Sequence, residues 1–76
     1  MKNSLLKDGI NIIDFINGTK ILNSKSEVRR AIIEKGIRVN DVTVFDDKKI
    51  VNKKDLKDDY IKVSYGKKKH FKIKFN

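Results

Sequence analysis

The chain has 76 residues, no cysteine, one histidine and a formal net charge of +9. These features exclude a disulfide-stapled scaffold and a metal centre built from a cluster of His and Cys, and no apolar run approaches the roughly 20 residues of a membrane span. The length predicts one small domain, the lack of cysteine fits a reducing compartment, and the excess of basic residues favours a polyanionic partner, nucleic acid first and an anionic membrane surface second.

The first ten residues are mostly polar, and we expect residues 1–5 to be flexible. Asn11 is a suitable N-cap for a short helix, with Asp14 in its first turn to favour the positive end of the helix dipole. We expect Gly18 to end this helix. Its apolar face would consist of Ile12, Ile13, Phe15 and Ile16.

A second helix is predicted from Ser24, where Ser24 and Glu27 form the S-x-x-E capping box. In that motif the Glu27 carboxylate accepts from the amide of Ser24. We expect the helix to run to about Lys35 and to end at Gly36 in the left-handed conformation. Val28, Ala31 and Ile32 share one face, while Ser26 and Arg30 lie opposite.

Alternating residues after the second helix predict a hairpin over residues 37–44, with Asn40-Asp41 as a turn tolerant of positive φ and Arg38 facing away from the core. Residues 45–49 read as a polar turn, 50–51 as a short strand and 53–57 as a single helical turn. The clearest strand pair is terminal, over residues 61–65 and 70–75, joined by the loop 66–69. The predicted class is α+β, with two short helices packed on a small, mainly antiparallel, curved sheet.

No arrangement of side chains indicates catalysis or metal binding. His70 lies on the polar side of a predicted strand among lysines, and we interpret it as a surface residue. The paired aspartates 46–47 and 58–59 fall in turns, where they cap and solubilise. The run Asn23-Ser24-Lys25-Ser26 is similar to the lysine-serine loop of class I aminoacyl-tRNA synthetases, but here it opens a capped helix in a chain too small for a nucleotide-binding fold, so we reject it as an ATP site.

Basic side chains gather on the second helix, on the strand after it and in the terminal loop. From Lys62 to the end there are six lysines and no acidic residue, which favours a basic face over mixed surface charge. If the terminal hairpin packs beside the second helix, these side chains form one patch suited to phosphates. Few exposed aromatics are expected, so we favour readout of the shape and backbone of a folded RNA over base stacking. The candidate RNA-binding residues are Lys25, Ser26, Arg29, Arg30, Lys35, Arg38, Asn40, Lys67, Lys68 and Lys69.

The run S-K-S-E-V-R-R-A-I-I-E-K-G-I-R-V-N, from Ser24 to Asn40, resembles the core of the S-four domain. This RNA-binding module occurs in ribosomal proteins, pseudouridine synthases, a small heat-shock ribosome-binding protein and bacterial tyrosyl-tRNA synthetases. The flanking runs G-I-N-I-I-D-F-I (9–16) and G-K-K-K-H-F-K-I (66–73) are similar to the first helix and the final strand pair of the C-terminal domain of those synthetases. The resemblance covers about Leu6 to Phe75.

The resemblance implies an S-four-like (αL motif) fold in which residues 1–76 are a single tRNA-binding domain, the C-terminal fragment of a larger cytoplasmic tyrosyl-tRNA synthetase. It implies that this chain alone is no enzyme and holds no cofactor, because ATP and tyrosine would bind the catalytic domain of a homodimeric parent. The implied partner is tRNA(Tyr), gripped at its long variable arm and anticodon stem, and the isolated domain would be a monomer. Asp41 stands where relatives commonly have Gly or Asn, which suggests that this turn lies away from the RNA.

Two alternatives remain open from the sequence. One is a stand-alone ribosome- or rRNA-associated protein with the same fold. The other is a basic protein-interaction or membrane-surface domain, which is disfavoured because the apolar residues are used by the core and no amphipathic helix is left over.

Overall fold

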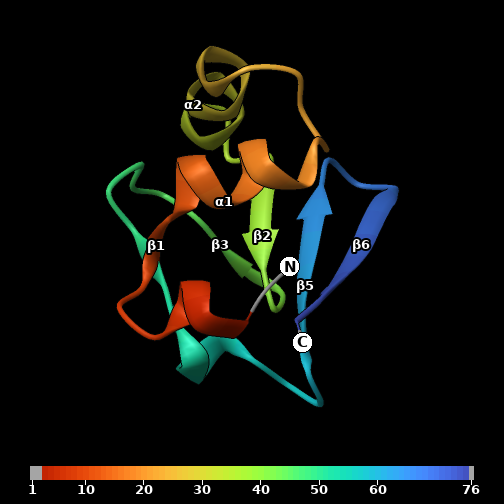
Figure 1. Ribbon diagram of the computed structural model, residues 1–76. Helices are drawn as coiled ribbons and strands as arrows, with labels where there is room; N and C mark the ends of the chain where they lie inside the picture. The colour runs from red at the N-terminus through yellow and green to blue at the C-terminus, as the bar shows by residue number, and fades with distance from the viewer. Residues whose placement is uncertain (1–2, 76) are drawn as a thin grey trace.

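A four-stranded antiparallel sheet in the order β3-β2-β5-β6 forms the frame of the computed structural model, which describes residues 3–75 (Figure 1). A second, two-stranded antiparallel sheet pairs β1 with β4. Two helices accompany the sheets, so the predicted α+β class is confirmed. The strands are β1 (Ile10–Asn11), β2 (Ile37–Val39), β3 (Val42–Thr43), β4 (Ile50–Val51), β5 (Tyr60–Tyr65) and β6 (Lys69–Lys74).

The helices α1 (Ile12–Thr19) and α2 (Lys25–Ile33) pack against each other. Helix α1 crosses in front of the four-stranded sheet, and α2 lies above one end of it (Figure 1). Two short 3-10 helices complete the fold, η1 (Asn3–Leu6) and η2 (Lys53–Asp55), the latter shorter than the helical turn predicted over 53–57. Residues 1 and 2 lie outside the described residues, so the flexibility expected for residues 1–5 stays a prediction.

The start of α1 follows the prediction and its end does not. The side chain of Asn11 accepts from the Ile13 amide at 2.9 Å, which caps the first turn. Gly18, however, lies within the helix, and Lys20 takes the left-handed conformation with φ of 61°. The reason is a hydrogen bond from the Lys20 amide to the Asn17 carbonyl at 3.2 Å, which closes the last turn two residues later than expected.

Both caps of α2 differ in detail from the sequence prediction. Ser24 accepts from the Glu27 amide at 3.2 Å as expected, but the Glu27 carboxylate accepts from the amide of Asn23, at 2.9 Å, rather than from that of Ser24. At the other end Lys35, not Gly36, has the left-handed conformation, with φ of 61°. Amides 35 and 36 donate to the carbonyls of residues 32 and 31, the paired bonds of a Schellman motif with lysine at its left-handed position.

Replacing Lys35 by Gly is expected to raise the free energy of unfolding by about 0.5–1 kcal/mol, because glycine adopts a positive φ without the steric cost of a Cβ. Lys35→Ala keeps the Cβ and removes the charge, so it should give no comparable gain. Urea unfolding of the three proteins, followed by circular dichroism, measures the difference. Equal stability of the Gly and Ala variants would show that a Cβ at this positive φ causes no steric strain.

The β2–β3 hairpin has the turn that its sequence predicts. Asn40 and Asp41 both have positive φ, 51° and 69°, as a two-residue type I′ turn requires. Arg38 faces away from the core between buried Ile37 and Val39. In the terminal hairpin Val63 pairs with Phe71 and Ile61 with Ile73, while Lys69 pairs with Tyr65 and belongs to β6, so the loop is one residue shorter than predicted.

The core lies between the two helices and the inner face of the four-stranded sheet. Phe15 of α1 is fully buried and stacks on Phe75 with ring centroids 6.0 Å apart. Half-buried Ile21 and Leu22, in the connection between the helices, pack against this core. The buried apolar residues are Leu6, Ile12, Ile13, Phe15, Ile16, Val28, Ala31, Ile32, Ile37, Val39, Val44, Val51, Ile61, Val63 and Phe75.

Candidate nucleic-acid interface

Helix α2 fixes the positions of the first group of candidate RNA-binding residues. Its buried face consists of Val28, Ala31 and Ile32, the three residues that the helical periodicity places together. The packing of this face against α1 and the sheet turns Lys25, Ser26, Arg29 and Arg30 to solvent, and all four are exposed.

The two arginines of α2 point to opposite flanks of the helix. Arg29 and Lys25 line a groove of about 340 Å³ against α1 and the turn that holds Asp47 and Lys48. The Lys25 ammonium lies 3.1 Å from the carboxylate of Asp14 in this groove. Arg29 therefore belongs to a region that contains both signs of charge.

Arg30 borders the other flank, a depression of about 360 Å³ that is also lined by Glu34 and Tyr65. Its guanidinium lies 3.2 Å from the Glu34 carboxylate, one helical turn away. This pair and the Lys25–Asp14 pair are both solvent-exposed, and such pairs contribute about 0–1 kcal/mol. An incoming phosphate can therefore replace either carboxylate at little cost.

The terminal loop lies next to the end of α2, which was the condition for a continuous basic patch. The Gly66 amide donates to the Gly36 carbonyl at 2.9 Å and holds the loop against the residue that follows α2. Gly66 has φ of 69°, which makes it the natural residue to begin this turn. Lys67 and Lys68 of the loop and Lys69 at the start of β6 are all exposed, and Lys69 lies 6.0 Å from the ring centre of Tyr65 on the Arg30 flank.

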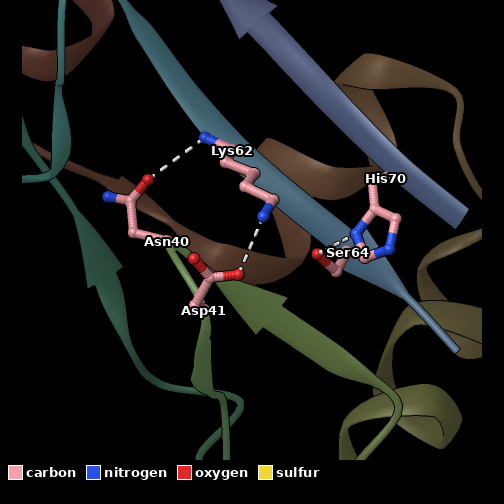
Figure 2. A network of polar contacts seen from close by, with 5 residues as sticks. All are labelled: Asn40, Asp41, Lys62, Ser64 and His70. Atoms are coloured by element: carbon pink, nitrogen blue, oxygen red, sulfur yellow. Dashed lines mark hydrogen bonds and ion pairs between the residues drawn. The ribbon is translucent and has the colours of Figure 1, made fainter. Parts of the chain in front are cut away.

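Arg38 lies apart from the helix, on the outer face of the four-stranded sheet. Its cross-strand neighbours there are Thr43 and Ser64. The Ser64 hydroxyl is buried and hydrogen-bonds to Nδ1 of exposed His70 at 2.9 Å (Figure 2). The structure thus places Arg38 on the outer face of the sheet, in none of the depressions that border α2.

The side chain of Asn40 makes hydrogen bonds within the protein. Its amide nitrogen donates to the Asp55 carbonyl at 2.6 Å, and its oxygen accepts from the Lys62 amide at 3.1 Å (Figure 2). These bonds tie the β2–β3 turn to η2 and to β5. Asn40 therefore has an evident structural role, which the sequence did not reveal.

Asp41 next to it faces Lys62, whose ammonium lies 2.9 Å from the carboxylate (Figure 2). The hydrogen bond from Lys62, aided by its charge, lowers the pKa of Asp41 below the ordinary value of an aspartate, so the carboxylate is ionised at neutral pH. The Lys62 ammonium balances this charge, so the expectation that the turn lies away from the RNA stays a prediction.

Two residues absent from the sequence-based candidates border the basic region. Lys48 lines the groove beside Arg29. Phe45 is 71% exposed, and the Lys35 ammonium lies 5.9 Å from its ring centre. Both were overlooked because they fall in residues 45–49, a run that reads as a polar turn.

Residues 3–75 contain neither a cluster of metal-binding side chains nor a helix that could span a membrane. Over this range the structure has no group of three or more His, Cys, Asp or Glu side chains that could hold a metal ion. None of the described helices has the length and apolar character needed to cross a membrane.

Comparison with known proteins gives a consistent set of relatives. Residues 2–73 match the family described as the tyrosine–tRNA ligase SYY-like C-terminal domain. The chain is 41% identical over 69 residues to a tyrosine–tRNA ligase of Pelagibacter ubique, and 41% identical over 69 residues to one of Acetivibrio thermocellus. Each alignment covers 91% of this chain and 17% of the relative, so the chain spans about a sixth of the length of the curated relatives it matches.

Proposed function

Because the chain belongs to the family of tyrosine–tRNA ligase C-terminal domains, we propose that it is a non-catalytic domain that binds tRNA(Tyr) through its basic surface. In this proposal the domain binds the long variable arm of the tRNA and the neighbouring anticodon stem. It supplies affinity and orientation, while the chemical reaction takes place elsewhere.

The observation that carries the proposal is the bond between the Gly66 amide and the Gly36 carbonyl, which brings the lysine-rich loop beside α2. Arg30 of α2 and Lys69 of the terminal hairpin then both lie beside Tyr65. If about six exposed cations neutralise phosphates, affinity falls by about a thousandfold between 50 and 200 mM salt. The proposed contacts are Lys25, Ser26, Arg29, Arg30, Lys35, Arg38, Lys67, Lys68 and Lys69, with Asn40 in a positioning role.

We further propose that the parent protein is a tyrosine–tRNA ligase, the name its relatives carry. It would act in the cytoplasm as a homodimer and attach tyrosine to its tRNA, and the part of the enzyme that binds ATP and tyrosine would lie outside this chain. This domain by itself would then be a monomer that neither binds those molecules nor catalyses the reaction.

A competition assay at about 100 mM salt, where electrostatic binding is neither saturated nor abolished, tests the proposal. Tyrosine tRNA is set against the same tRNA with its variable arm shortened. We expect a large loss of affinity on shortening. Equal binding of the two RNAs would overturn the proposal and favour the alternative, a ribosome- or rRNA-associated protein of the same fold.

A further inference from the structure

Phe45 is an exposed aromatic side chain at the edge of the proposed RNA-binding surface. It follows Val44, which is buried, and the Val44 amide donates to the Ile37 carbonyl at 2.9 Å. This bond extends the β2–β3 pairing by one residue and fixes the backbone next to Phe45. Since neighbouring residues of an extended chain point to opposite sides, anchoring Val44 in the core directs Phe45 outward.

One lysine borders the Phe45 ring. The Lys35 ammonium lies 5.9 Å from the ring centre, a cation–π contact. Lys35 is held in place because it is the left-handed residue of the Schellman motif that ends α2. The carboxylate of Asp46, the next residue, is turned away into its own loop, where it accepts from the Lys48 amide at 2.9 Å.

The backbone register also places Phe45 beside the proposed contacts. Val44 lies opposite Ile37, the residue after Gly36, and the Gly36 carbonyl binds the Gly66 amide of the terminal hairpin. A nucleotide on Phe45 would therefore have the ammonium of Lys35 within reach of its phosphate. A protein partner would need a contiguous apolar patch of several hundred Å², whereas this ring is bordered by a lysine.

We propose that Phe45, oriented by Lys35, is a stacking platform for an unpaired nucleobase of the bound RNA. This inference rests on the proposed function and deepens it, because it adds a base contact to a surface otherwise suited to phosphates. A nucleobase presents a flat π face to the ring, and such stacking tolerates any base. Paired bases are stacked within their helix, so the ligand must be a loop, a bulge or a single-stranded end.

Affinity measurements on the 76-residue chain with tyrosine tRNA distinguish the contribution of base stacking to binding from that of charge. Phe45→Ala is expected to weaken binding about tenfold at every salt concentration, with the slope of log K against log salt unchanged. Phe45→Leu keeps apolar area but lacks a π face, so it should weaken binding nearly as much, whereas Phe45→Tyr should bind like the wild type. Val42→Ala is the matched control, because Val42 is 66% exposed in the same hairpin and should leave affinity unchanged.

A fluorescence measurement reports on the contact itself. The chain has no tryptophan, so Phe45→Trp introduces a single one. Its emission is expected to fall on saturation with an RNA hairpin that has a single-stranded loop, and to stay unchanged with a fully paired RNA duplex. Wild-type affinity in Phe45→Ala or Phe45→Leu, or equal quenching by hairpin and duplex, would overturn the inference. A wild-type chain that fails to bind tRNA would instead overturn the proposed function.

Discussion

Phe15→Ala is expected to remove about 3–5 kcal/mol from the free energy of unfolding. The Phe15 side chain is fully buried and stacks on Phe75, so truncation loses both its apolar burial and the ring contact and leaves a cavity between α1 and β6. At about 0.05–0.15 kcal/mol per residue, a domain of this length has a total of about 4–11 kcal/mol. The variant should therefore lose from about a quarter to all of this stability.

Urea unfolding followed by circular dichroism measures this loss, and Phe45→Ala is its matched control. The same atoms are deleted at a position that is 71% exposed, where substitutions stay within about 0.5 kcal/mol. A loss below about 1 kcal/mol for Phe15→Ala, or equal losses for the two variants, would contradict the central place assigned to Phe15.

The helices were predictable because their signals are local. The Asn11 and Ser24 caps and the 3.6-residue periodicity specify where α1 and α2 begin and which faces they bury. Their ends were less predictable. The rule that glycine takes the left-handed position failed at Lys20 and Lys35, where backbone hydrogen bonds that close the final turn compensate the strain of a Cβ.

The sequence did not indicate which distant segments pair with each other. The β1 strand has two residues and pairs with β4 far along the chain, and neither has a pattern long enough to indicate the match. For the same reason the sequence identified Asn40 as a turn residue but not its bonds to Asp55 and Lys62. Such contacts depend on how η2 and β5 are placed by the whole fold.

The basic residues were identifiable from the sequence, but their grouping was not. Helical geometry separates Arg29 from Arg30 by about 100°, yet only the packing of α2 determines what each one faces. Arg29 faces the Asp47–Lys48 turn and Arg30 faces Tyr65. This division suggests that an RNA lying across the exposed face of α2 meets cations on both flanks.

Replacing Arg29 and Arg30 together by Ala is therefore expected to weaken tRNA binding by about fiftyfold at 100 mM salt. Each neutralised phosphate contributes about 0.9 to the slope of log K against log salt, so the loss of two contacts lowers the slope by about 2. At this salt concentration a slope change of that size corresponds to nearly two orders of magnitude in affinity. Filter binding or fluorescence anisotropy over a range of salt concentrations yields both quantities.

The matched control is the double replacement of Lys53 and Lys54 by Ala. Both residues are exposed, and they lie in η2, at the opposite end of the molecule from α2 (Figure 1). The control removes the same two charges, so a general effect of net charge would weaken binding equally in both variants. A specific interface on α2 requires that the arginine variant lose at least ten times more affinity than the control. It also requires that the slope of log K against log salt change in the arginine variant and not in the control. If the two variants behave alike, the domain attracts RNA only through its overall charge, and α2 is not the surface that the RNA contacts.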